Sequence, residues 1–411
     1  MGCFLVYTAV GAGRLYPLIP TLRQLRDRGH HVVVYTEQEH LGLLAHLDLE
    51  AHAIDPRIEQ VTDAYWRAST RIQVLARTAT AQADCAELEL ADVQAAIRAH
   101  HPDAVVVDCS GWGAAAAAAT SGTAWAQLTT TLLPLDLPGR PPFGLGLPPT
   151  RQPFTQARHT VLRKQIETAV GAVLARVNRL RSTVGLPPVA RLGDLSVQAP
   201  LVLSYTAPPL EHPAELLPPA VRLVGAQDWD PDDQPIPDWL TQLPPPLVLV
   251  ARSTVYQKDG HLIQTTLDAL ADSPLSVVAT STSRNPAQYR VPGNAAVHRF
   301  VPHRTVLRRA VCVIGTATIG LTQKALLAGV PVCAVPIGRD QWEVASRVDV
   351  CGAGVRLPAG RLNPGRLRLA VQAAIAWQPA ARAAAATLHQ SWGTNTAAAA
   401  LQSLVTHQAT A

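Results

Sequence analysis

Two short polar turns, each placed directly after an apolar stretch, are the parts of this sequence best suited to bind a charged ligand. Residues 315–318 follow the apolar run 311–314, and residues 338–341 follow the run 331–336. An apolar run, a polar turn and a helical stretch in succession form the repeating unit of a parallel sheet. Ligands of such sheets bind beyond the carboxyl ends of the strands, where helix N-termini offer N–H groups to anions. The two turns therefore predict a site for a phosphorylated ligand.

The first half places two charged residues, Asp108 and Arg14, after predicted strands. Asp108 ends the apolar run 104–107, so its carboxylate should lie at the carboxyl edge of a predicted strand. Arg14 follows the turn after the first predicted strand, 3–10. Three alternatives stay open: an ion pair between the two, a solvated Arg14, or an Asp108 that only caps the next turn.

These residues need a layered α/β framework to bring them together. Apolar periodicity predicts strand 3–10, helix 18–28 and strand 31–36 at the start of the chain. The motif Gly11-x-Gly13 alone is a weak phosphate signal, and a tight strand-to-helix turn explains it better. The other strands predicted in the first half are 51–54, 104–107, 124–128 and 197–204, and the helices are 39–47, 74–100, 114–120 and 156–181.

The second half repeats the alternation of strands and helices after two proline-rich connectors, 207–219 and 228–246. This pattern predicts an α/β protein with two Rossmann-like domains that face a cleft. We place the two predicted domains at residues 1–215 and 216–385. Residues 386–411 are predicted to form a C-terminal helix that crosses back over the first domain.

The composition excludes several classes of protein. The 411 residues are 48% hydrophobic and 16% charged, which is typical of a globular chain. A net charge of +5 without basic runs, with 5% aromatic residues, argues against nucleic-acid binding. The six cysteines show no CxxC spacing, so we expect a reducing, cytoplasmic setting and no metal site. No signal peptide is apparent, and no apolar stretch is long enough to span a membrane.

A series of motifs covers both halves of the chain. The motifs of the second half are Arg252-Ser253-Thr254-Val255-Tyr256-Gln257, Val301-Pro302-His303, Ala325-Leu326-x-x-Gly329-Val330-Pro331, Pro336-x-Gly338-Arg339-Asp340-Gln341 and Gly352-Ala353-Gly354-Val355-Arg356-Leu357. The first half adds Gly13-x-x-x-Pro17-Leu18-x-Pro20 and Arg28-Gly29-His30-His31-Val32. Together they resemble the actinobacterial macrolide-type branch of family 1 glycosyltransferases, which have the two-Rossmann GT-B fold.

The resemblance implies an enzyme of natural-product and antibiotic biosynthesis. Family members transfer a sugar from a nucleotide-diphosphate sugar to a small hydrophobic acceptor, with inversion and without a metal. A UDP- or dTDP-sugar is then the co-substrate, and no tightly bound cofactor is expected. The resemblance implies neither a nucleic-acid partner nor a membrane span, and a homodimer stays open.

The resemblance implies that residues 1–215 form an acceptor-binding domain and residues 216–385 a nucleotide-sugar-binding domain. It also assigns roles to single residues. Asp108 and Arg14 are the catalytic candidates, Trp112 and Tyr16 are the acceptor-binding candidates, and no metal ligand is expected. The residues implied for the nucleotide sugar are Ser253, Thr254, His303, Thr316, Ala317, Thr318, Lys324, Asp340 and Gln341.

Several of these residues could instead have a purely structural role. Thr316 and Thr318 are good helix N-cap residues, and an acid such as Asp340 is favourable at a helix start in any protein. Lys324 could contact phosphate or lie on a solvated helix face. Trp112 could form an acceptor wall or belong to the core.

The sequence departs from the family pattern at two positions. Arg14 stands where the family has its usual base, a histidine, and arginine does not give up its proton at working pH. Thr316 stands where the family has a phosphate-facing histidine. We therefore expect Asp108 to act alone as the base on an acidic acceptor, with Arg14 holding the acceptor's anionic group. The alternative is a repurposed GT-B scaffold that binds a hydrophobic small molecule and assists or catalyses another step. A purely structural module is the third reading.

Overall fold

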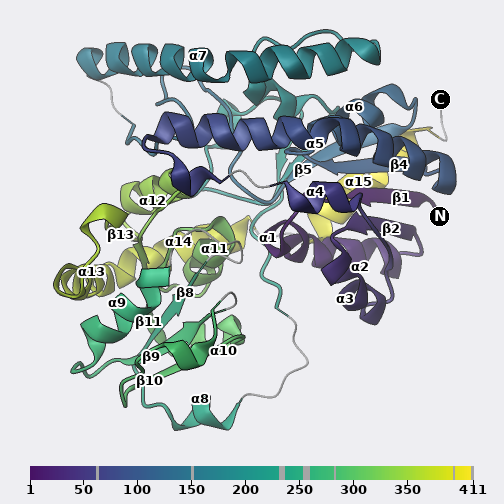
Figure 1. Ribbon diagram of the computed structural model, residues 1–411. Helices are drawn as coiled ribbons and strands as arrows, with labels where there is room; N and C mark the ends of the chain where they lie inside the picture. Colours follow the sequence, from purple (N-terminus) through teal and green to yellow (C-terminus); the bar gives the residue numbers. More distant parts are fainter. Residues whose placement is uncertain are drawn as a thin grey trace.

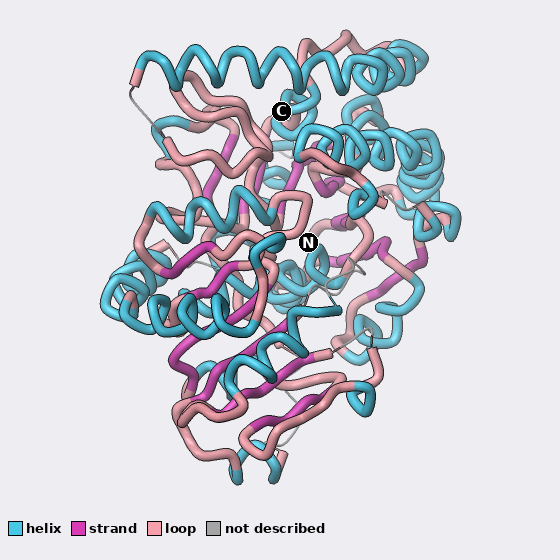
Figure 2. Tube along the Cα trace, turned by 60° about the vertical axis from the view of Figure 1, so that its left-hand side comes forward, coloured by secondary structure: helices cyan, strands magenta, loops and turns pink. Residues whose placement is uncertain are grey.

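The computed structural model describes residues 1–61, 64–149, 152–230, 237–252, 260–281, 284–391 and 394–408. Two parallel sheets, each enclosed by helices, form the two halves of the molecule (Figures 1 and 2). This arrangement confirms the predicted pair of Rossmann-like domains. Among the described residues, no helix is both long and apolar enough to cross a membrane.

The first sheet has seven strands in the order β3-β2-β1-β4-β5-β6-β7, and all its pairings are parallel. Its central strands are continuous apolar runs because helices cover both faces, so each strand is buried on both sides. The strands are β1 (Cys3–Tyr7), β2 (His31–Thr36), β3 (Glu50–Ala53), β4 (Ala104–Asp108), β5 (Ala124–Thr129), β6 (Leu201–Ser204) and β7 (Val221–Leu223).

The helices of this half connect successive strands. They are α1 (Ala12–Leu15), α2 (Ile19–Asp27), α3 (Leu41–His46), α4 (Pro56–Gln60), α5 (Arg71–His100), α6 (Trp112–Thr120) and α7 (Pro153–Thr183). The long predicted helices 74–100 and 156–181 are confirmed, and each begins three residues earlier than predicted.

The second sheet has six strands in the order β10-β9-β8-β11-β12-β13, again all parallel. Its strands are β8 (Leu247–Ala251), β9 (Ser276–Thr280), β10 (Ala295–His298), β11 (Ala310–Gly315), β12 (Val332–Ala334) and β13 (Gly354–Arg356). The helices of this half are α8 (Asp238–Gln242), α9 (Gly260–Leu270), α10 (His303–Leu307), α11 (Ile319–Leu327), α12 (Gln341–Val350), α13 (Pro364–Ala376) and α14 (Gln378–Gln390).

The last helix, α15 (Thr394–Gln408), returns to the first sheet, as predicted, and packs against α2 and β5 (Figure 1). Ala397, Ala398 and Leu401 are buried there in the same core cluster as Leu22 of α2. The apolar face of this helix therefore ties the end of the chain to its beginning.

One prediction about the first sheet was wrong. Residues 197–204 were expected to form its last strand, but β6 begins only at Leu201, and β7 pairs with it further along the chain. Residue 197 instead ends a 3-10 turn, Leu192–Val197. The sheet thus continues past residue 215. The domain limits 1–215, 216–385 and 386–411 stay a prediction.

Candidate active site

Arg14 and Asp108 form an ion pair in the first half of the molecule. Arg14 lies on the short helix α1, directly after the turn at Gly11, and Asp108 is the last residue of β4. The Nη1 atom of Arg14 lies 3.5 Å from Oδ1 of Asp108 and also donates to the hydroxyl of Thr131 over 3.3 Å. β1 and β4 are neighbours in the parallel sheet, which brings the segments that follow them together.

The Asp108 carboxylate is 1% exposed, and its two oxygens have different surroundings. Oδ1 accepts the backbone N–H of Ser110 over 2.8 Å and the hydroxyl of the same residue. Oδ2 is buried and makes no hydrogen bond to a described residue. A buried carboxylate oxygen without a donor is costly, so this atom is the natural place for a hydroxyl supplied by a ligand.

Asp340, at the N-cap of α12 in the second half, interacts electrostatically with Arg14. Burial opposes the charge of the Arg14 guanidinium, but the negative charges of Asp108 and Asp340 outweigh it, and the pKa of Arg14 is raised. Burial raises the pKa of Asp340, against the opposing effect of Arg14 and Arg339. The Oδ2 atom of Asp340 is also buried and makes no hydrogen bond to a described residue. Charged groups from both halves thus converge here.

The turn before α12 is packed closely against the first half. A Cβ atom at Gly338 would lie 2.1 Å from a ring carbon of Tyr65, so only glycine fits. Next to it, the Arg339 guanidinium lies 5.1 Å from the centre of the Tyr65 ring. Gln341 is 2% exposed, and its Oε1 accepts the N–H groups of Ile337 and Gly338. The structure thus uses the Gln341 carbonyl to shape the turn that presents Asp340.

The turn after β11 leads into the N-terminus of α11. Thr316 and Ala317 are each 1% exposed, and Ala317 has a left-handed backbone with φ of 60°. The Thr316 hydroxyl is buried and makes no hydrogen bond to a described residue. Thr318 is the N-cap residue but forms no side-chain cap, and a Cβ at Gly320 would meet no described residue within 4 Å. The described part of the chain therefore leaves the first turn of α11 open at Gly320, close in sequence to the Thr316 hydroxyl.

Lys324 and His303 lie beside the acidic part of the interdomain connector. The Lys324 ammonium pairs with Asp230 and donates to the carbonyl of Trp229 over 2.8 Å. His303 Nε2 lies 2.9 Å from the Thr280 hydroxyl. Burial, with the positive charge of Lys324, lowers the pKa of His303 to about 4, so its imidazole is neutral at pH 7. Lys324 therefore binds the connector here.

The two predicted acceptor residues pack against other parts of the protein. Trp112 is 7% exposed and lies in a core cluster with Ala83 of α5 and Val177 of α7. The Tyr16 ring packs edge-on against Trp229, with 5.2 Å between ring centres. Ser253 and Thr254, predicted to contact the nucleotide sugar, lie outside the described residues.

A pocket of about 320 Å³ lies between the two halves. The first half lines it with Tyr65, Trp66 and the start of α5, and the second half adds Ile337 and Trp342. The Arg71 guanidinium lies 5.0 Å from the centre of the Trp342 ring. The pocket and the Arg14–Asp108 pair thus adjoin the same turn, 337–341. Only the adjacent aromatic residues Tyr65 and Trp66 could have indicated it from sequence.

Glu343 was not predicted to have a role. It is 8% exposed, and its Oε1 accepts the N–H groups of Gly144 and Gly146 over 2.9 and 2.8 Å. The loop 132–149 is thereby held on α12 of the second half.

Glu89, in the middle of α5, was also not predicted. It is 5% exposed and accepts the N–H of Gly113 over 3.0 Å at the start of α6. Burial raises its pKa to about 8, and the charge of Asp108 adds to this effect. No local sequence signal marks this buried acid on a long helix.

The fold and the convergence of charged groups between two Rossmann-like halves define a protein of the GT-B glycosyltransferase fold. CalG4, the calicheamicin glycosyltransferase, superimposes with a TM-score of 0.76 at 19% identity, over 98% of each chain. The glycosyltransferase VinC, solved in complex with dTDP, gives a TM-score of 0.71 at 19% identity, over 98% of this chain and all of that one.

Sequence comparisons agree with the fold. Residues 264–401 match the family model of the erythromycin biosynthesis protein CIII-like C-terminal domain. The 4′-demethylrebeccamycin synthase of Lentzea aerocolonigenes is 29% identical over 387 residues, which is 90% of this chain and 91% of the relative. The resemblance to natural-product glycosyltransferases is confirmed, and the matches support sugar transfer over the repurposed scaffold.

Proposed function

We propose that this protein transfers a sugar, with inversion and without a metal, from a dTDP- or UDP-sugar to a small hydrophobic acceptor that bears an acidic hydroxyl. The observation that carries the proposal is the ion pair of Arg14 and Asp108, and the negative charge of Asp340 from the second half also acts on Arg14. Asp108 and Asp340 are carboxylates, and each has a buried oxygen that accepts no hydrogen bond from the described residues. Sugar and acceptor hydroxyls are the donors that would satisfy them.

In the proposed reaction, Oδ2 of Asp108 takes the proton of the acceptor hydroxyl as the acceptor oxygen attacks the anomeric carbon. A new C–O bond forms there, and the bond from that carbon to the diphosphate oxygen breaks. The nucleotide diphosphate leaves with the electron pair. Because attack and departure occur on opposite faces in one displacement, the anomeric configuration inverts.

Arg14 serves as a fixed positive charge in this scheme. Its neighbours keep it protonated, so it neither takes nor gives the transferred proton. Placed next to the base, it stabilises the oxyanion that forms as the acceptor loses its proton. This arrangement favours a phenol or a carboxylic acid, which needs only a weak base, over an aliphatic alcohol.

The start of α11 is the proposed binding site of the leaving diphosphate. The first N–H groups of a helix have no partner within the helix, and its dipole favours an anion at that end. Gly320 leaves the first turn open, and the Thr316 hydroxyl supplies a further donor. Asp340 would accept a hydrogen bond from the sugar.

The interdomain pocket beside the turn 337–341 is the proposed acceptor site. Its aromatic lining, Tyr65, Trp66 and Trp342, suits a flat hydrophobic molecule. The cation–aromatic contact of Arg71 with Trp342 holds one wall in place. We further propose cytoplasmic action without a tightly bound cofactor, a setting in which six free cysteines persist.

Calorimetric titration with dTDP and UDP, followed by a transfer assay with phenolic acceptors, tests the proposal. We expect binding of at least one nucleotide in the micromolar range and transfer that EDTA does not reduce. Absence of binding by either nucleotide at millimolar concentration would contradict the donor site. Retention of the anomeric configuration in the product would contradict the single displacement.

A further inference from the structure

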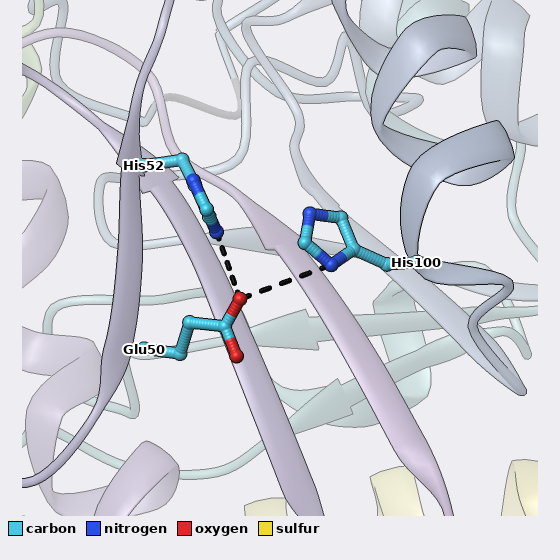
Figure 3. Close-up of side chains that lie close together, drawn as sticks. All are labelled: Glu50, His52 and His100. Atoms are coloured by element: carbon cyan, nitrogen blue, oxygen red, sulfur yellow. Dashed lines mark hydrogen bonds and ion pairs between the residues drawn. The ribbon is translucent and has the colours of Figure 1, made fainter.

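Glu50, His52 and His100 meet at the edge of the first sheet (Figure 3), and His31 contacts the same carboxylate. Glu50 and His52 are two residues apart on β3, the edge strand, so both side chains lie on the same face of the sheet. His31 begins β2, the neighbouring strand, and His100 is the last residue of α5. The four residues come from three elements, and only the tertiary structure brings them together.

The Glu50 carboxylate is the centre of the cluster. His52 Nε2 lies 2.8 Å and His100 Nδ1 3.9 Å from Oε1 of Glu50, while His31 Nε2 lies 2.7 Å from Oε2. One ligand atom from each of Glu50, His52 and His100 lies within 4.8 Å of the other two. Ligand atoms around a tetrahedral zinc lie about 3.3 Å apart, given Zn–N bonds of about 2.0–2.1 Å. Small rotations of these side chains would therefore close the site.

The contact of His100 with Tyr35 leaves the Nδ1 atom of its imidazole available to bind a metal. The Tyr35 hydroxyl lies 3.1 Å from His100 Nε2, so the other ring nitrogen, Nδ1, faces Glu50. In proteins, a metal-binding imidazole commonly engages its second nitrogen with a neighbouring oxygen, which fixes ring orientation and tautomer. The Tyr35 ring also stacks on His52, with 5.2 Å between centres, and limits the positions of that imidazole.

We propose that Glu50, His52 and His100 bind a divalent transition-metal ion of the zinc class. Two imidazoles and a carboxylate form a ligand set that zinc prefers, and water would complete the coordination because the site is open to solvent. The exposed fractions of the Glu50, His52 and His100 side chains are 40%, 43% and 16%. His31, on the second carboxylate oxygen, acts as a positioning residue.

This site is separate from the proposed transfer site. α5 spans 30 residues, so its two ends lie about 45 Å apart. Its first residue, Arg71, contacts Trp342 of the second half, whereas His100 lies at the far end. A metal there would link the edge strand β3 to α5 and stabilise the edge of the sheet, and it would take no part in sugar transfer.

The second cluster of this kind among the described residues is weaker. It combines Glu37, Glu39 and one imidazole, His40. The Glu37 carboxylate already accepts the N–H of Gly11 over 2.5 Å, so it holds the turn before Arg14. The cluster also lacks the second imidazole that the Glu50 cluster has.

Calorimetric titration of the untagged full chain with ZnCl2, after removal of metals by a chelator, tests the site. We expect one ion per chain with micromolar or tighter affinity, and a Tm several degrees higher with zinc than with magnesium. His52→Asn and His100→Asn should each weaken zinc binding at least tenfold and abolish the rise in Tm. His31→Asn should weaken binding less and keep the stoichiometry.

His46→Asn is the matched control, because His46 is an exposed histidine of α3 outside the cluster. It should bind zinc as the wild-type chain does. Circular dichroism without metal would verify that each variant is folded. Substoichiometric binding by the wild-type chain, or unchanged affinity in both His52→Asn and His100→Asn, would overturn the proposal. An equal rise in Tm with magnesium would do the same.

Discussion

The Nη1 atom of Arg14 lies 3.5 Å from Oδ1 of Asp108, and this pair joins the first helix of the chain to the end of β4. The Asp108 carboxylate is buried, so removal of the Arg14 charge would leave it poorly compensated. Asp108 therefore has one oxygen committed to Arg14 and Ser110 and a second oxygen left for a ligand. The roles expected of Asp108 and Arg14 rest on this difference between the two carboxylate oxygens.

Asp108→Asn should reduce transfer about 10²–10⁴-fold, because an amide cannot take the acceptor proton. The variant keeps an oxygen for the Ser110 N–H, so it should fold. Transfer rate and circular dichroism are the measurements. Asp27→Asn, which removes an exposed partner of Arg26, is the matched control and should keep full activity. Full activity of Asp108→Asn would remove Asp108 as the base.

Arg14→His should lower transfer to a phenolic acceptor and raise the KM for that acceptor about tenfold. The reason is that a histidine at pH 7 is mostly neutral and cannot supply the lasting positive charge that faces Asp108 and Asp340. Arg23→His, at an exposed position of α2, serves as the control. A rise in activity of Arg14→His would mean that position 14 lacks only a base.

Gly320→Ala should weaken nucleotide binding at least tenfold without loss of stability. No described residue lies within 4 Å of the added methyl group, and alanine is favoured over glycine within a helix by about 0.5–1 kcal/mol. The methyl group would instead occupy space proposed for the diphosphate. Calorimetry with dTDP and a thermal melt measure the two effects.

Gly171→Ala in α7 is the matched control for this change, since that methyl group also meets nothing within 4 Å. It should leave nucleotide affinity unchanged. If Gly320→Ala bound nucleotide as tightly as the wild-type chain, the diphosphate would have to bind elsewhere.

Glu343→Ala should lower the stability by a few kcal/mol and raise the KM for the acceptor. The change leaves the buried N–H groups of Gly144 and Gly146 without their acceptor, at about 1–3 kcal/mol each. Urea unfolding and acceptor kinetics would measure both effects. Glu167→Ala, at an exposed site of α7, should change neither. An unaltered midpoint in Glu343→Ala would show that this carboxylate does not hold the loop.

Glu89→Gln should be more stable than the wild-type chain at pH 8 but not at pH 5. The folded protein keeps the Glu89 proton up to its pKa of about 8, whereas the unfolded chain releases it near 4.5. Wild-type stability therefore falls as the pH rises between these values, by at most about 1.4 kcal/mol per pH unit from this group.

Glutamine removes this dependence and keeps an oxygen for the Gly113 N–H. Denaturant midpoints of both proteins at several pH values would test it. Glu87→Gln, two residues away and exposed, is the control. Parallel pH profiles of wild type and Glu89→Gln would contradict the expectation.

The sequence by itself determined the kind of fold and the location of the two polar turns. Strands such as 104–107 and helices such as 74–100 can be read locally, because a buried strand is a short apolar run and a helix repeats every 3.6 residues. The motif Gly338-Arg339-Asp340-Gln341 indicated the glycosyltransferase resemblance for the same reason, since its residues are adjacent in the chain.

Only the tertiary structure decided which distant side chains meet. In the folded chain, Lys324 forms an ion pair with Asp230, and the Gln341 carbonyl accepts hydrogen bonds within its own turn. Glu343 accepts the N–H of Gly144 and so holds that loop. The tertiary structure also gathered His52 and His100 around Glu50. Such contacts depend on sheet order, register and helix length together, and local periodicity records none of these. The physical reason is that the energy of a buried polar group comes from partners far away in sequence.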